Sequence, residues 1–181
     1  PSIAVHTHKY GQAASDNAFV AVTGTDVMPD LALGRLSIEN NVEGAILIDK
    51  LSQYPGDNSK KWRNNVLLVG SGVSDIDESL FNFNDGSLYL KNTFLEGTGY
   101  GWEQIFRYPN KPTHMAYYGD VLDMRRIIND GVTLINYYGH GGGYQWDNTF
   151  SNEDIYLLQN ENRQPLALSV TCYTAHFDNQ D

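Results

Sequence analysis

The sequence is poor in cysteine and in basic residues, and each shortage excludes a class of protein. Cys172 is the only cysteine among 181 residues, which rules out a disulfide scaffold and a zinc site built from several thiolates of this chain. Twelve Lys and Arg against 22 Asp and Glu give a formal net charge of −10. Nucleic acid is therefore not an expected partner, because binding a phosphate backbone depends on clustered positive charge.

Long hydrophobic runs are also missing. The apolar runs, such as residues 66–69, are far too short to cross a bilayer, so no transmembrane segment is predicted. Internal repeats and low-complexity tracts are absent as well. The hydrophobic fraction of 41% is nevertheless sufficient for the core of one domain of ordinary size.

Apolar periodicity predicts strands and helices that alternate along most of the chain. The predicted strands cover residues 18–22, 31–36, 66–69, 104–107, 132–137 and 166–171. The predicted helices cover residues 39–54, 87–95, 120–129 and 151–159. Residues 1–17 have no sustained period and are expected to form an irregular lead-in to a domain over residues 18–181. Such alternation favours an α/β fold with a mainly parallel sheet flanked by helices.

Two of these strands end in residues that can carry chemistry. His140 follows the strand at 132–137 within a glycine-rich run, and Cys172 directly follows the last strand. The interval between them has room for one helix and one strand, so a right-handed crossover would bring both residues to one edge of the sheet. An imidazole can supply the base or cationic partner that a reactive thiol needs. The flanking glycines leave the ring accessible and let a backbone N–H stabilise an oxyanion.

The residue pattern leaves other interpretations open. A single cysteine after an apolar strand is commonly inert core packing. The run at 139–143 could cradle a phosphate, although no lysine signature accompanies it. His140 and His176 could share a metal with Asp178, although their spacing is not typical of zinc sites. A flavodoxin-like binding domain would place a small molecule at the same strand ends and would need no reactive thiol.

Several motifs in a fixed order favour one family. The most specific are residues 138–141, Tyr-Gly-His-Gly, with Trp146 downstream, and residues 171–178, Thr-Cys-Tyr-Thr-Ala-His-Phe-Asp. Others are Pro-Asp-Leu-Ala-Leu-Gly-Arg at 29–35, Trp-Arg at 62–63 and Asp-Gly at 130–131. Over about residues 16–178 the sequence resembles the gingipain family of cysteine peptidases, which are relatives of the caspases.

This resemblance implies a caspase-like three-layer sandwich and a cysteine endopeptidase that acts through Cys172 and His140. It also implies an oxyanion hole formed by the backbone N–H groups of Gly141 and Cys172, with no organic cofactor required and room for a structural calcium ion. The expected substrate is a protein or peptide, and the expected location is secreted or at the cell surface. The family's catalytic domain continues past the cysteine, so the remainder of the polypeptide beyond Asp181 is expected to complete the substrate cleft.

The sequence departs from the family pattern at two places. Family members carry an acidic residue after the strand equivalent to 66–69 that orients the histidine, and here the first carboxylate in that loop is Asp75. In the family, preference for substrates with a basic side chain depends on an acidic residue just ahead of the helix equivalent to 87–95. Asp85 is the nearest candidate, followed by Asp77 and Glu78. The remaining alternatives are a transpeptidase resembling the sortase of the type IX secretion system, and a catalytically silent secretion or adhesion module.

Overall fold

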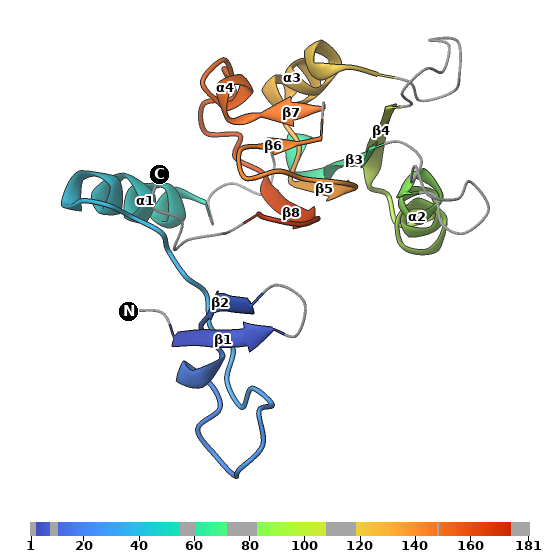
Figure 1. Cartoon of the computed structure of the whole chain (residues 1–181). Helices are drawn as coiled ribbons and strands as arrows, with labels where there is room; N and C mark the ends of the chain where they lie inside the picture. Colours follow the sequence, from blue (N-terminus) through green and yellow to red (C-terminus); the bar gives the residue numbers. More distant parts are fainter. Residues whose placement is uncertain are drawn as a thin grey trace. The chain divides into compact units, whose positions relative to one another are not determined.

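A four-stranded parallel sheet forms the centre of one of the two units into which the chain divides (Figure 1). The computed structural model describes residues 3–7, 11–54, 61–71, 83–107, 119–147 and 149–174. One unit contains residues 1–48 and 175–181, and the other contains residues 49–174. In the second unit the strand order is β4 (Gly101–Arg107), β3 (Asn65–Ser71), β5 (Leu134–Tyr138) and β8 (Leu166–Val170).

Strand β3 lies at the centre of the sheet because its sequence is apolar on both faces. It pairs in parallel with β4 on one side and with β5 on the other. Residues 66–71 are all buried, as expected of a parallel strand that is covered on both faces. The predicted parallel sheet is therefore confirmed, together with the predicted strands that became β3, β4, β5 and β8.

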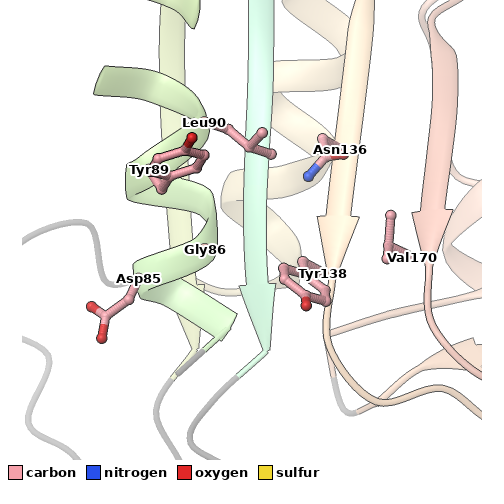
Figure 2. Close-up of a pocket in the computed structure, with 7 residues that line it drawn as sticks. All are labelled: Asp85, Gly86, Tyr89, Leu90, Asn136, Tyr138 and Val170. Atoms are coloured by element: carbon pink, nitrogen blue, oxygen red, sulfur yellow. The ribbon is translucent and has the colours of Figure 1, made fainter. Parts of the chain in front are cut away.

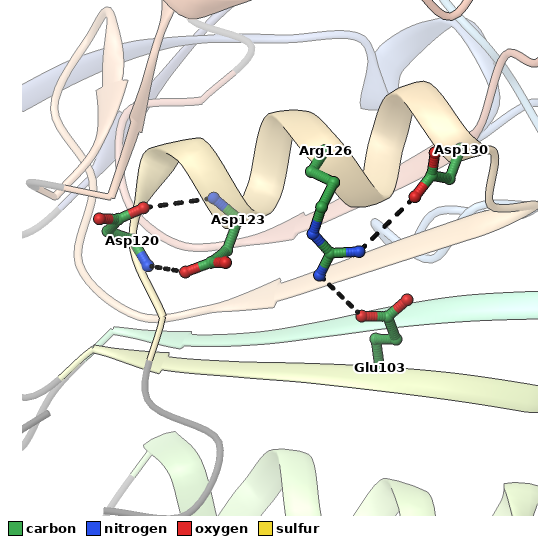
Figure 3. A network of polar contacts seen from close by, with 5 residues as sticks. All are labelled: Glu103, Asp120, Asp123, Arg126 and Asp130. Carbon is green, nitrogen blue, oxygen red and sulfur yellow. Dashed lines mark hydrogen bonds and ion pairs between the residues drawn. The ribbon is translucent and has the colours of Figure 1, made fainter. Parts of the chain in front are cut away.

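Helix α3 (Val121–Asp130) covers one face of this sheet. Met124, Ile127 and Ile128 are buried in a core cluster that also contains Leu67 and Val69 of β3. The helix begins at Asp120, whose carboxylate accepts from the backbone N–H groups of Leu122 and Asp123. Figure 3 shows this cap, and farther along the helix it shows Arg126 bridging Glu103 of β4 and Asp130.

Helix α2 (Phe83–Leu90) packs on the opposite face. Successive side chains of a strand point to opposite faces. Asn84 of α2 lies against Gly70, whereas Leu67 and Val69 pack in the cluster with α3. A Cβ at Gly70 would lie 2.1 Å from Oδ1 of Asn84, so this approach requires glycine. A π-helical turn, η3 (Lys91–Leu95), continues α2 toward β4. Helices on both faces of one parallel sheet confirm the predicted α/β fold class.

The remaining elements are short, except for helix α1 (Asn41–Gln53), which confirms the helix predicted at 39–54. They are the hairpin of β1 (Ile3–Thr7) and β2 (Gly11–Ser15), the 3-10 turns η1 (Asn17–Phe19) and η2 (Lys61–Asn64), the hairpin of β6 (Gln145–Trp146) and β7 (Phe150–Ser151), and helix α4 (Asn152–Ile155). Among the described residues, no helix combines the length and hydropathy needed to span a membrane.

The predicted strands at 18–22 and 31–36 are wrong. The Asp30 carboxylate accepts from the backbone N–H groups of Val22 and Thr23 at 2.8 Å, so local bonds replace a strand ladder there. At 31–36 the alternating Leu31 and Leu33 are exposed, and in the described part of the chain no strand pairs with them.

Two other predictions of local structure need correction. Within the predicted irregular lead-in, residues 3–7 and 11–15 form the antiparallel strands β1 and β2, with Ile3 paired to Ser15. The helix predicted over 151–159 is one turn, α4. It starts with the Ser151–Asp154 capping box and ends in tight turns, in which Leu157 and Leu158 donate to residues three positions earlier.

Candidate active site

His140 and Cys172 follow neighbouring strands of the sheet. Strands β5 and β8 pair in parallel, and their last register pair is Tyr138 with Val170. His140 and Cys172 each lie the same distance along the chain beyond that pair. The expectation that both residues leave the sheet at the same edge is confirmed.

The two loops after these strands are in close backbone contact. The N–H of Gly139 donates to the carbonyl of Val170 at 3.5 Å. A Cβ on Gly141 would lie 2.6 Å from Oγ1 of Thr171 and 2.8 Å from the carbonyl oxygen of Cys172. Only glycine fits at position 141, so the backbone that follows His140 packs directly against that of Cys172.

Both candidate side chains are accessible. Cys172 is a free, exposed cysteine, which contradicts the alternative of a buried core residue. His140 is also exposed, and its ring meets the edge of Phe83 with centroids 5.0 Å apart and an interplanar angle of 85°. An exposed thiol and an exposed imidazole on adjacent loops can act on a substrate that lies over this edge.

An aromatic and polar cluster that ranges from buried to partly buried packs against the His140 loop. Tyr137 is 0% exposed, its hydroxyl donates to the carbonyl oxygen of His140, and its ring stacks on Trp146 with centroids 4.6 Å apart. Trp146 donates from Nε1 to Oγ of Ser169 at 2.6 Å. Burial, aided by the charge of Asp147 and opposed by a hydrogen bond with Ser71, raises the pKa of Tyr137 to about 12. No local sequence signal indicated a role for these residues in the site, although Trp146 lies in one of the family motifs.

A pocket of about 570 Å³ opens between α2 and the strands β5 and β8. Its lining residues are Asp85, Gly86, Tyr89, Leu90, Asn136, Tyr138 and Val170 (Figure 2). The buried Nδ2 of Asn136 has no hydrogen-bond partner among the described residues. Asp85 is exposed in the first turn of α2, and its carboxylate points away from the strands in Figure 2.

Other predicted site residues lie outside the described residues. These are Asp75, Asp77, Glu78, His176 and Asp178. Among the residues that the structure does describe, no three His, Cys, Asp or Glu side chains gather in a group that could hold a metal ion.

The fold and this edge of the sheet define an α/β domain of the caspase-like class with a candidate thiol–imidazole site. The chain belongs to peptidase family C25, whose model matches residues 2–181. The predicted gingipain relationship, and with it the class of cysteine peptidase, is confirmed.

Two similar proteins are distant in sequence and much longer than this chain. Lys-gingipain HG66 of Porphyromonas gingivalis is 26% identical over 175 residues, which cover 94% of this chain and 9% of that protein. Gingipain R2 of the same organism is 25% identical over 172 residues, which cover 90% of this chain and 22% of that protein. The crystal structure of the Arg specific cysteine proteinase gingipain R matches with a TM-score of 0.73 at 24% identity, covering 91% of this chain and 37% of that chain. This structural likeness supports the fold.

Proposed function

We propose that this chain carries the catalytic pair of a cysteine endopeptidase, with Cys172 as nucleophile and His140 as general base and acid. The observation that carries the proposal is the contact of the two loops at the ends of β5 and β8, where Gly141 packs against Cys172. An exposed thiol beside an imidazole is the arrangement that covalent catalysis by cysteine requires.

The proposed reaction is acyl transfer in two steps. The Cys172 sulfur attacks the peptide carbonyl carbon, and His140, which takes the thiol proton, passes it to the departing amine. Water then attacks the carbonyl carbon of the thioester and gives a proton to His140. The carboxylic acid product leaves as the bond to sulfur breaks, and His140 returns the proton to the Cys172 sulfur. Backbone N–H groups of Gly141 and Cys172 donate to the oxyanion in both steps. These steps need only protein groups and water, so the proposed reaction involves no organic cofactor, and a calcium ion would have a structural role alone.

The substrate is proposed to be a protein or peptide with a basic side chain in the pocket beside α2. Among the described lining residues only Asp85 is charged, and a buried cation needs such a countercharge. Val170, which lines the same pocket, lies two residues before Cys172. Asp75 is proposed as the acid that orients His140. The division into a lead-in at 1–17 and a peptidase domain at 18–181 remains a prediction, as does a secreted or cell-surface location.

Covalent labelling tests this proposal. The protein is treated with a peptidyl chloromethyl ketone that has Lys or Arg at P1, and its intact mass is measured. We expect one adduct in the wild type, none in Cys172→Ala, and labelling slowed by roughly 10²–10⁴-fold in His140→Ala. His6→Ala, in strand β1, controls for the loss of an imidazole elsewhere. An adduct that persists in Cys172→Ala, or a folded wild type that never labels, would contradict the proposal.

A further inference from the structure

The side chain of Tyr137 contacts and hydrogen-bonds the backbone of His140. Tyr137 is fully buried, and its hydroxyl donates to the carbonyl oxygen of His140, three residues farther along the chain. A Cβ on Gly139 would lie 2.5 Å from this hydroxyl oxygen. The turn from β5 to His140 therefore folds directly over the phenol, which occupies the space that a side chain at position 139 would need.

The same phenol is connected to the strand that leads to Cys172. The ring of Tyr137 is parallel to that of Trp146, with an interplanar angle of 2°. The indole N–H of Trp146 donates to the hydroxyl of Ser169 in β8, three residues before Cys172. Two side chains thus connect the carbonyl of His140 to the strand that carries the thiol.

The end of strand β3 also contacts the residues that connect Tyr137 to β8. The hydroxyl of Ser71, at the end of β3 and 1% exposed, donates to the carboxylate of Asp147, the residue after Trp146. A Cβ on Gly139 would also lie 2.5 Å from Cβ of Ser71. The ends of β3, β5 and β8 therefore meet in one cluster, in which Tyr137 and Ser71 are buried and Trp146 and Ser169 are partly buried. With a pKa of about 12, Tyr137 stays a neutral hydrogen-bond donor at physiological pH.

We infer that Tyr137, through its stack on Trp146, is a positioning residue that sets the placement of His140 relative to Cys172. The inference rests on the proposed function and deepens it, because it names what holds the two reacting groups in register. A displacement of about 1 Å between reacting groups can cost about 10²-fold in rate. Neither Tyr137 nor Trp146 is assigned any contact with substrate, so their effect is on the geometry of the pair.

Single-atom changes at the two ends of the connection test this inference. Tyr137→Phe keeps the stacked ring and removes the hydroxyl, and Ser169→Ala removes the acceptor of the indole N–H. We expect each to lower kcat by roughly 10- to 100-fold with KM within about twofold, because placement of reacting groups rather than substrate binding is lost. The double variant should lose less than the product of the single losses, because both changes break one connection. Tyr156→Phe makes the same chemical change at an exposed position and should leave kcat unchanged.

Active-site titration with the peptidyl chloromethyl ketone separates a positioning role from a folding defect. Rates are expressed per titrated site, so molecules that fail to fold do not contribute. If Tyr137→Phe and Ser169→Ala lower the melting temperature but keep the wild-type kcat per site, the inference is wrong. If Tyr137→Phe does not fold, Ser169→Ala alone decides the matter by the same criterion. Failure of the wild type itself to label and to cleave overturns the proposed function, which is a different result from an active wild type with unaffected variants.

Discussion

Individual glycines determine how closely the two candidate catalytic loops approach. From the sequence, the glycines around His140 were expected to expose its ring and to free a backbone N–H. The structure adds a packing reason, because Gly139 and Gly141 lie where any Cβ would overlap Tyr137 or Cys172. Gly142, the next residue, has no heavy atom within 4 Å of its would-be Cβ. Neighbouring glycines of this loop therefore differ in whether the packing around them leaves space for a side chain.

Replacement of Gly141 by alanine should impair the site with little effect on the fold. The new methyl group would meet Thr171 and the Cys172 carbonyl, so the two loops must separate. We expect kcat/KM to fall by roughly 10²-fold or more, since a shift of about 1 Å suffices for that loss. Gly142→Ala is the matched control and should retain activity within about threefold, because its site has open space. Equal losses in both variants would mean that the loop tolerates no side chain anywhere.

Asp85→Asn tests the specificity proposed for the pocket. The change removes charge but keeps the size of the side chain, so substrates with Lys or Arg at P1 should lose roughly 10- to 10³-fold in kcat/KM, whereas neutral substrates should not. Rates on paired peptide substrates that differ only at P1 measure this. Glu153→Gln removes a charge from exposed α4 as a control. If basic and neutral substrates respond alike, Asp85 does not select the side chain, which would agree with a carboxylate that stays turned away from the strands.

Among the elements, α3 shows how local signals and tertiary packing act together. Asp120 and Gly131 mark its ends in the sequence, and the structure places the N-cap and the positive-φ C-terminal residue at these positions. A Cβ at Gly131 would also lie 2.7 Å from Cβ of Trp62. The residue that ends the helix therefore also permits contact with the neighbouring turn η2.

Removal of the α3 cap should destabilise the protein by an amount typical of such caps. In Asp120→Ala the N–H groups of Leu122 and Asp123 lose their acceptor, so we expect the free energy of unfolding to fall by about 1 kcal/mol. Urea denaturation measures the change. Asp120→Asn keeps an acceptor oxygen and should lose less than half as much. Identical behaviour of the Ala and Asn variants would show that the charge, and not the cap, stabilises the helix.

The stability of the whole molecule should depend on Tyr137 at alkaline pH. Its folded pKa of about 12 exceeds the unfolded value of about 10. Folding therefore favours the protonated phenol. The resulting contribution to the free energy of unfolding is fully present below pH 10 and is lost as the pH rises toward 12. The free energy of unfolding should fall over this range, and the fall should be shallower in Tyr137→Phe. Chemical denaturation at several pH values gives both slopes, with Tyr156→Phe as the control; indistinguishable slopes for Tyr137→Phe and wild type would contradict the prediction.

The errors in the predicted strands show where local patterns stop being informative about the whole molecule. Residues 31–36 have the alternating apolar pattern of a strand, but a strand forms only where a partner satisfies its backbone, and among the described residues none does so. The run at 66–69 was predicted correctly because apolar residues on both faces can only be buried between layers. At 31–36 the pattern therefore indicated neither burial nor pairing within the described part of the chain.

Local sequence patterns were sufficient to predict the alternation of helices and strands from residue 39 onward, the ends of α3, and the two residues, His140 and Cys172, that follow β5 and β8. These features depend on local periodicity, capping and residue chemistry, which are properties of short segments. The register between β5 and β8 and the hydrogen bond from Tyr137 to the His140 carbonyl could be found only in the folded chain. The same is true of the bond from Trp146 to Ser169 across the cluster. The strand pairing and the Trp146–Ser169 bond join residues that are distant in sequence, so their geometry depends on how the layers pack, which no local pattern encodes.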